Sequence, residues 1–252
     1  MSDPGDLLPA VAALWGAAAG ALLPRAAYRF CVPSAQEGEE QQGWRRTCPQ
    51  GHPVRGWLGT ARCRACPPGT ASYGPRAWPL ALVTALLCAA LAAATGTRPE
   101  LGVWLLLTPV GVLLAVVDLR VQRLPDPLTL PLAGAAALLL GLAALAPEHA
   151  GHWTTALLGA LALGGGYFLL FLINPAGMAF GDVKLALGTG AVLGWYGWPT
   201  LLLGTFAGFL FGALYGGFLV VARGAGRRTA IAFGPLLLAG AFAGVLVGAY
   251  TA

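Results

Sequence analysis

Residues 101–118 read LGVWLLLTPVGVLLAVVD, and this stretch decides the fold because an apolar run from Leu101 to Val117 ends abruptly at Asp118. A run of this length can cross about 30 Å of hydrocarbon as a helix. Comparable runs recur near residues 7–23, 78–95, 128–145, 153–173, 183–198, 200–222 and 231–250. The sequence therefore predicts an all-α, polytopic membrane protein with about eight transmembrane helices.

One of these runs leaves the number of spans open. Segment 183–198 is short, and only the Trp-Tyr-Gly-Trp-Pro turn at residues 195–199 separates it from the next run. Seven spans, or a re-entrant segment in place of one span, are therefore alternatives to eight.

The composition excludes an ordinary soluble domain. Of 252 residues, 57% are hydrophobic and only 10% are charged, whereas soluble domains carry about 25% charged residues. Lipid is the solvent that suits this composition. The net charge of +5 comes from residues in the predicted loops. It therefore indicates the topology of the chain and contact with membrane lipid, and it does not indicate a nucleic acid partner.

The basic residues predict which side of the membrane each loop occupies. With the amino terminus outside, every Lys and Arg except Arg98 falls in an inside segment, among them Arg223, Arg227 and Arg228, as the positive-inside rule requires. The acidic start at residues 1–6 lacks the basic region of a signal peptide, which favours a retained first span. We expect a multi-pass protein of the bacterial inner membrane.

Three regions follow from this topology. Residues 1–24 form the first transmembrane helix, residues 25–77 form a cytoplasmic loop domain that contains cysteines, and residues 78–252 form the transmembrane core.

Two of the ten acidic residues lie at membrane depth. Asp118 ends one apolar run and Asp182 begins another, and in this topology both lie at the inside ends of their spans. Intramembrane carboxylates are costly and usually functional. Two adjacent carboxyls share a proton, so one can activate water while the other polarises a peptide carbonyl. The alternative is that each aspartate caps a helix or pairs with Arg120, Arg123 or Lys184.

The sequences around the two aspartates resemble known motifs. Asp118 is followed by five residues and then Leu124-Pro125-Asp126, and Asp182 stands in GMAFGDVKL, residues 177–185. These resemble the two motifs of the prepilin peptidases, which are type IV leader peptidases of the GxGD aspartic protease class. Leu128–Leu132 and the Ala-Phe-Gly-Pro of residues 232–235 add to the similarity.

The resemblance implies Asp118 and Asp182 as the catalytic pair. It also implies that five residues position the substrate or the loops of the site: Pro125, Asp126, Gly177, Gly181 and Lys184. One residue departs from the pattern, because Ala179 stands where the family has the first Gly of Gly-x-Gly-Asp. Glycine at such a place permits unusual backbone angles or close approach.

The same resemblance implies a function. The family removes the leader from type IV prepilin or pseudopilin precursors at the cytoplasmic face, with no cofactor for proteolysis, and many members then methylate the new amino terminus with S-adenosylmethionine. Two alternatives stay open: a transporter or channel that uses the two aspartates for proton or cation coupling, and a non-catalytic assembly protein of a pilus or secretion system.

The polar segment suggests a metal site. Prepilin peptidases commonly carry two Cys-x-x-Cys pairs there, and Cys63-Arg-Ala-Cys66 is intact. In the other pair, Cys48-Pro-Gln-Gly-His52, a glycine replaces the second cysteine. Cys48, His52, Cys63 and Cys66 would make a Cys₃His zinc set. Cys31 in place of His52, or reduced thiols without metal, are the alternatives.

Overall fold

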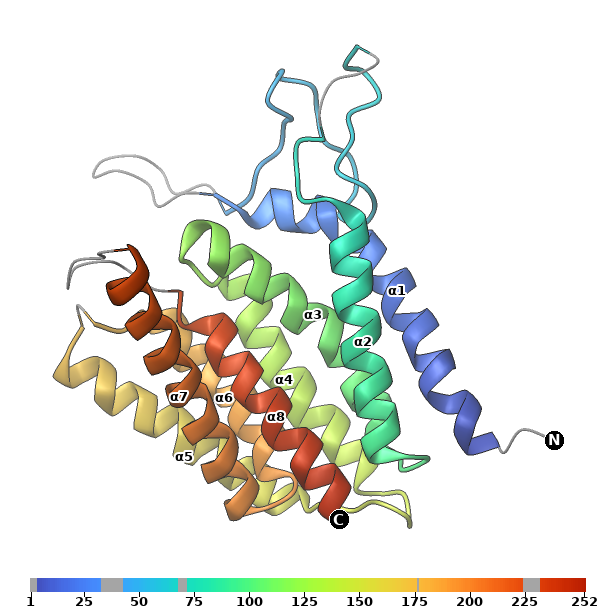
Figure 1. The fold of residues 1–252 in the computed structure, drawn as a ribbon, viewed down its shortest axis with the longest axis vertical. Coiled ribbons are helices and arrows are strands. Elements are labelled where there is room, and N and C mark those ends of the chain that lie inside the picture. The colour runs from blue at the N-terminus through green and yellow to red at the C-terminus, as the bar shows by residue number, and fades with distance from the viewer. Residues whose placement is uncertain (1–3, 33–42, 68–71, 176, 224–231) are drawn as a thin grey trace.

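The fold is all helical across the part of the chain that can be described. The computed structural model describes residues 4–32, 43–67, 72–175, 177–223 and 232–252. In these ranges the helices are α1 (Pro4–Phe30), α2 (Ala77–Thr95), α3 (Glu100–Val121), α4 (Asp126–Ala143), α5 (Trp153–Ile173), α6 (Phe180–Gly194), α7 (Trp198–Arg223) and α8 (Gly234–Thr251) (Figure 1). The predicted all-α membrane fold is confirmed. Arg227 and Arg228, which support the predicted topology, lie outside the described residues.

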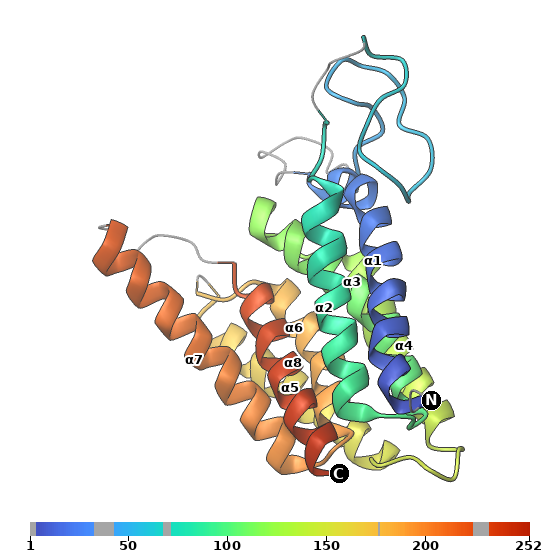
Figure 2. The ribbon, with the colours of Figure 1, turned by 45° about the vertical axis from the view of Figure 1, so that its right-hand side comes forward.

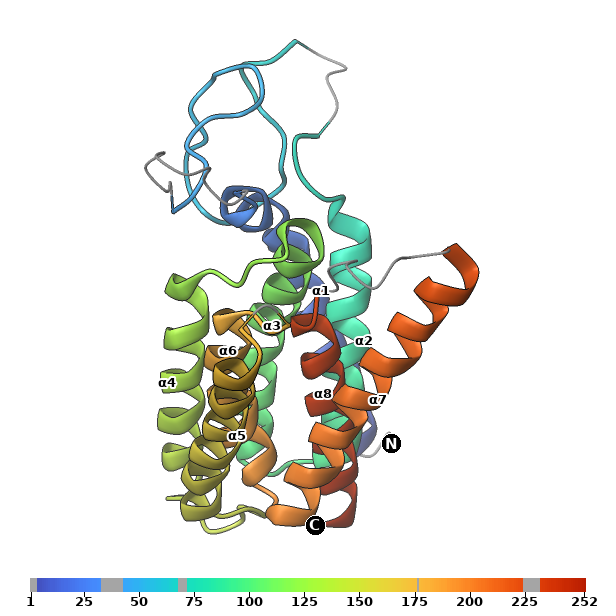
Figure 3. The same ribbon diagram turned by 90° about the vertical axis from the view of Figure 1, so that its left-hand side faces the viewer.

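Seven of the eight helices are long and apolar enough to cross a membrane, and α6 is the exception. With 15 residues, α6 is only about 22 Å long at 1.5 Å per residue. It is nevertheless one continuous helix, and it runs inside the bundle beside α4, α5 and α8 (Figure 3). The short predicted segment is thus a buried inner helix, which explains why it needs no lipid-facing length.

Glycines allow α6 to approach α5 closely. A Cβ on Gly159 would lie 2.6 Å from the carbonyl oxygen of Gly190, and a Cβ on Gly194 would lie 2.5 Å from that of Thr155. Such contacts are too short for any side chain, so the two backbones touch, as is common where membrane helices pack through small residues. This packing fixes where the first turn of α6 lies.

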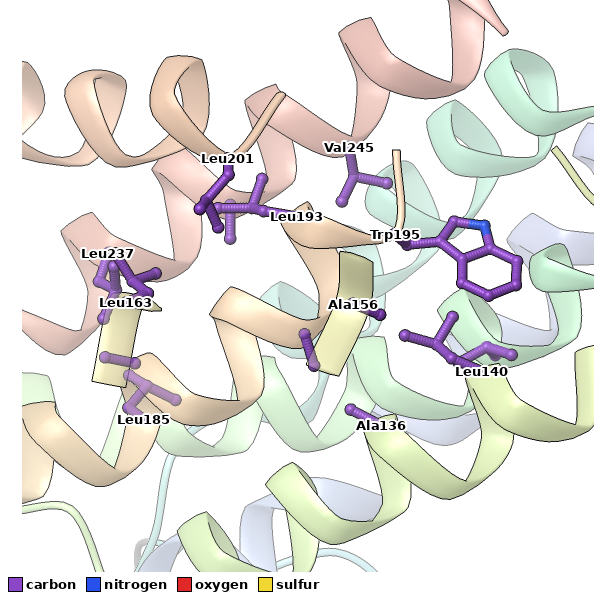
Figure 4. Close-up of a cluster of buried hydrophobic side chains, with 14 of the residues drawn as sticks. Ala136, Leu140, Ala156, Leu163, Leu185, Leu193, Trp195, Leu201, Leu237 and Val245 are labelled. Carbon is purple, nitrogen blue, oxygen red and sulfur yellow. The ribbon is translucent and has the colours of Figure 1, made fainter. Parts of the chain in front are cut away.

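The main hydrophobic core surrounds α6. Leu185 and Leu193 of α6 are fully buried, and they pack in one cluster with Leu163 of α5 and Leu237 of α8 (Figure 4). Trp195 closes the cluster at the end of α6, beside Leu140 and Ala156 (Figure 4). The helix that carries Asp182 is therefore held on several sides.

The remaining helices lie around this core. α1 packs against α2 and α3 on one side of the bundle, and α7 packs mainly against α8 on the other (Figures 1 and 2). α2, α3 and α8 thus lie between the two outer helices.

The first helix continues beyond the predicted boundary at residue 24 and carries the polar segment. Pro24 lies inside α1, where proline removes a backbone hydrogen bond and bends a helix. The last part of α1 is turned sideways, under the cysteine segment, residues 43–67 (Figure 1). Arg25, Tyr28 and Arg29 share one helix face and donate hydrogen bonds of 2.8–3.0 Å to backbone carbonyls of that segment. The cysteine segment is therefore anchored to α1.

Candidate active site

The first half of the site is built where α3 ends. Gln122 adopts a left-handed conformation with φ 49°, and its N–H donates to the carbonyl oxygen of Asp118 over 2.8 Å. The chain then turns, and Pro125 precedes α4 in an extended conformation. Asp118 therefore lies in the last turn of α3, and the left-handed turn at Gln122 follows directly after that helix.

Asp118 and Asp182 belong to helices that both pack against α8. Asp182 lies in the first turn of α6, and the two residues are only 4% and 5% exposed. Their carboxyl groups are close enough for their charges to interact. The N–H of Gly234, at the start of α8, donates a 3.0 Å hydrogen bond to Oδ2 of Asp118. Helix α8 therefore contacts both of the helices that carry a buried carboxyl.

Lys184 has a partner other than these two aspartates. Its Nζ lies 2.6 Å from Oδ1 of Asp126 and 4.8 Å from the ring centre of Phe180. The pair links the second turn of α6, two residues after Asp182, to the first turn of α4. Because the Asp126 side chain is 60% exposed, the pair contributes at most about 1 kcal/mol, and its main effect is positional.

The backbone of the loop before Asp182 explains why alanine can stand at position 179, where the family pattern has glycine. Ala179 is exposed and has φ −78° and ψ 143°, angles that any residue adopts, so glycine is not needed there. Gly181 is different, because a Cβ on it would lie 2.9 Å from Cβ of Leu124. A Cβ on Gly177 would meet the side chain of Asn174. The retained Gly181 permits the close contact between α6 and the α3–α4 turn.

Two features of the site were not predicted from the sequence. The sequence of residues 232–235 indicates only similarity to the family, whereas in the structure the N–H of Gly234 donates a hydrogen bond to Asp118. Tyr167 of α5 is 1% exposed, interacts electrostatically with Asp182, and has a hydroxyl with no hydrogen-bond partner among the described residues. Its ring stacks on that of Phe209 and meets that of Phe233 at a tilt of 43°. Tyr167 is the single tyrosine in the apolar run of residues 153–173, and a polar group at that depth is the signal by which the sequence could have identified it.

The four predicted metal ligands converge in the cysteine segment. One donor atom from each of Cys48, His52, Cys63 and Cys66 lies within 4.8 Å of the others. The Cys48 and Cys66 sulfurs are 3.8 Å apart, and Nδ1 of His52 lies 3.7 and 3.4 Å from them. With Zn–S bonds of about 2.3 Å, a tetrahedral site has sulfurs about 3.8 Å apart. The cluster could hold a metal, and its spacing fits zinc.

The turn that contains Gly51 shapes this cluster. Gly51 has φ +84°, and its N–H donates to the carbonyl of Cys48 over 2.9 Å. Desolvation alone would raise the pKa of Cys48, but the backbone N–H of Gln50 and the side chain of His52 lower that pKa to about 6. Cys31 lies elsewhere, in a hydrophobic cluster with Phe30. Of the two proposed fourth ligands, His52 is therefore the one at the site.

Several known proteins are similar in sequence to this chain. The family model for the type IV leader peptidase family matches residues 105–217. A protein from Aeromonas salmonicida (strain A449), named prepilin leader peptidase/N-methyltransferase, is 35% identical over 194 residues, which cover 73% of this chain and 61% of that protein. Proteins of the same name from Pseudomonas aeruginosa and Pseudomonas putida are 34% and 32% identical, over 75% and 82% of this chain and 66% and 70% of their own lengths. No solved structure matches significantly.

The class of protein that the helices define is a multi-pass membrane protein. The chain belongs to the type IV leader peptidase family. It spans about 61% of the length of the Aeromonas relatives that it matches.

Proposed function

We propose that this protein is a membrane-embedded aspartic endopeptidase that removes the leader from type IV prepilin or pseudopilin precursors. The observation that carries the proposal is the pair of buried carboxyls of Asp118 and Asp182. Two such groups at close range do not both ionise easily, so they hold one proton between them. The ionised member takes a proton from water, and the protonated member donates a hydrogen bond to the scissile carbonyl oxygen. No metal or covalent intermediate is needed.

Three contacts support this step. The N–H of Gly234 stabilises the ionised form of Asp118, since hydrogen bonds to a carboxylate favour its charge. Gly181 lets the first turn of α6 approach the α3–α4 turn. The Lys184–Asp126 pair holds α6 against α4. In this proposal Pro125 and Gly177 shape the two loops that border the carboxyls.

The site's depth suits the proposed substrate. A prepilin-like precursor has a charged leader followed by an apolar helix, so its scissile bond lies at the membrane interface. Asp118 and Asp182 lie at the ends of their helices, and the positive-inside rule assigns those ends to the cytoplasmic side. We propose an amino terminus outside and residues 25–77 in the cytoplasm. Family membership does not favour a transporter or channel.

A cleavage assay with two isosteric variants tests the proposal. Asp118→Asn and Asp182→Asn should each lower the rate of leader removal by about 10³-fold or more, because each removes one member of the proton-sharing pair. Thermal unfolding should show that both variants stay folded. Full activity in either variant would exclude the pair as the catalytic groups.

The cysteine segment adds a structural proposal. Cys48, His52, Cys63 and Cys66 bind one zinc ion, which stabilises a small region with little hydrophobic core of its own. Purified protein should contain about one zinc per chain by atomic absorption, and metal-free protein of native stability would refute this.

Methylation is a separate part of the proposal. The names of the relatives include N-methyltransferase, and by that analogy the chain transfers a methyl group from S-adenosylmethionine to the new amino terminus. Mass spectrometry of the cleaved product tests it, and an unmethylated product in the presence of the methyl donor would limit the activity to proteolysis.

A further inference from the structure

Buried polar groups gather at the end of the bundle opposite the cysteine segment, where α2 and α6 end and α3 begins (Figure 1). Among the described residues, six buried side-chain polar atoms have no hydrogen-bond partner. Three of the six lie at this end: Oγ1 of Thr95, Oε2 of Glu100 and Nε1 of Trp195. These residues are only 0–1% exposed. Because buried polar groups in proteins almost always have a partner, this concentration needs an explanation.

Glu100 is the most demanding of the three. It begins α3, and its Oε1 accepts a 3.4 Å hydrogen bond from the N–H of Ala150 in the α4–α5 loop. The ion pair found among the described residues joins Lys184 to Asp126, so Glu100 has no cationic partner among them. A carboxyl that is removed from solvent is costly unless its oxygens are hydrogen-bonded. Whether Glu100 is ionised or protonated, its Oε2 therefore needs a partner.

The α4–α5 loop brings Trp195 to the same place. Ala150, which contacts Glu100, is followed by Gly151, and a Cβ on Gly151 would lie 2.5 Å from Nε1 of Trp195. The N–H of His152 then donates a 2.9 Å hydrogen bond to the carbonyl oxygen of Trp195. Successive loop residues thus contact the carboxyl and the indole, and the two unpartnered groups lie on either side of this loop.

Tyr196 joins Thr95 to this group. Its hydroxyl accepts a 3.3 Å hydrogen bond from Nε1 of Trp104, and its side chain interacts with both Thr95 and Glu100. We call Thr95, Glu100, Trp195 and Tyr196 the distal polar cluster. The cluster joins the end of α2, the start of α3 and the end of α6. It therefore lies at the far ends of the two helices that carry the proposed catalytic aspartates.

The chemistry of the three unpartnered atoms fits water. Nε1 of Trp195 can only donate, an ionised Glu100 can only accept, and the hydroxyl of Thr95 can do either. A water molecule donates two hydrogen bonds and accepts two. It can therefore accept from the indole N–H while it donates to Oε2 of Glu100 and to Oγ1 of Thr95. Buried waters typically make about three such bonds.

A cation fits this cluster less well. The indole N–H of Trp195 directs a hydrogen at the ligand and cannot coordinate a metal ion. The positive charge of Arg98 also interacts with Tyr196. Among the described residues, the donor atoms with metal-ligand spacing belong to the cysteine segment, and the distal polar cluster does not include them.

We propose that the distal polar cluster binds ordered water, which bridges Thr95, Glu100 and Trp195 and holds the far ends of α3 and α6 together. Glu100 is then a positioning residue, because it acts at one end of α3 while Asp118 lies at the other. The water site is independent of the chain's function, and only its effect on cleavage rests on the peptidase function proposed above.

X-ray footprinting detects such a water directly. Radiolysis of a bound water produces hydroxyl radicals that label the side chain beside it, even when that side chain is buried. Relative to its rate in the unfolded chain, Trp195 should be labelled about tenfold faster than Leu237, which is equally buried in the same hydrophobic core. Equal protection of the two residues would overturn the proposal.

A matched pair of variants at Glu100 supplies the second test. Glu100→Gln keeps an oxygen for the N–H of Ala150 and an amide that can bind water, whereas Glu100→Met keeps the length of the side chain and removes both. Glu100→Met should lose the fast labelling of Trp195 and lower the unfolding temperature by about 5 °C or more, and Glu100→Gln should retain both. The same labelling in the two variants would refute the role of Glu100. If Glu100→Met does not fold, Thr95→Val, which removes one hydroxyl at similar volume, takes its place in the comparison.

Two further readouts separate the remaining outcomes. Replacing sodium chloride by choline chloride should leave the unfolding temperature unchanged, and a fall would identify a cation in the cluster instead of water. Glu100→Met should lower kcat for a prepilin-like precursor about tenfold with KM unchanged, and Glu100→Gln should restore it. Equal kcat values for these two variants would refute the positioning role. If the unmodified protein cleaves no such precursor, the proposed function fails, while the labelling of Trp195 still decides the water site.

Discussion

The glycine that touches Asp118 provides a sharp test of the site. In Gly234→Ala the new Cβ would lie 2.8 Å from Oδ2 and 3.3 Å from Cγ of Asp118, with Cδ1 of Leu124 at 3.4 Å. Carbon and oxygen atoms do not pack at 2.8 Å, so the carboxyl must move by several tenths of an ångström. The variant therefore displaces one carboxyl of the proposed catalytic pair without changing its chemistry.

The expected loss follows from the contact that is disturbed. The Gly234 N–H bond to Asp118, 3.0 Å long, is a hydrogen bond to a charged group, worth about 1.5–3 kcal/mol. Losing most of it, together with misplacement of the carboxyl, should lower kcat about 10- to 100-fold. The stability should change little, because Gly234, the first residue of α8, is not among the glycines with positive φ, so alanine adds no backbone strain there.

The assay compares two variants for cleavage and for unfolding. Gly134→Ala on α4 is the control, since a Cβ there meets nothing within 4 Å. We expect Gly134→Ala to cleave a prepilin-like precursor at the native rate, and Gly234→Ala to lose kcat while KM and the unfolding temperature stay near native values. Equal rates for the two variants would refute the geometry described for Asp118 and Gly234.

Three further predictions concern other parts of the molecule. His52→Ala should lose the bound zinc and His52→Cys should retain it, as measured by atomic absorption; unchanged zinc in His52→Ala would remove His52 from the site. Tyr167→Phe should lower kcat a few-fold to about tenfold with KM unchanged, because a hydroxyl near Asp182 is lost, and an unchanged kcat would assign the hydroxyl no role. Gly240→Ala should lower stability by about 1–3 kcal/mol, since its Cβ would meet the backbone of Gly204 on α7. An unfolding temperature equal to that of the native protein would contradict the close α7–α8 packing.

Much of the architecture is predictable from the sequence, because apolar length and charge position are strong local signals. The run from Leu101 to Val117 and its neighbours predict the helices, and the short segment 183–198 already suggested an unusual one. What the sequence does not show is that α6 is buried by its neighbours, since that depends on backbone contacts such as Gly159 against Gly190.

The two carboxyls stand out in the sequence, but the contacts made around them do not. Asp118 and Asp182 stand out because charges are rare at membrane depth. Lys184 and Asp126 were each singled out, but their pairing follows from the approach of α6 to α4. The hydrogen bond from Gly234 comes from a backbone N–H more than a hundred residues away in the chain, and no side-chain pattern marks it.

The measurement that tests the central claim most directly asks whether positions 118 and 182 meet. Cysteines are introduced by Asp118→Cys and Asp182→Cys in a chain whose five native cysteines are replaced by alanine, and a short bifunctional thiol reagent is added in membranes. We expect efficient crosslinking of this pair, and none when Gly102→Cys, at the far end of α3, replaces Asp118→Cys. Crosslinking of the 118–182 pair no stronger than that control would show that the two carboxyls do not meet.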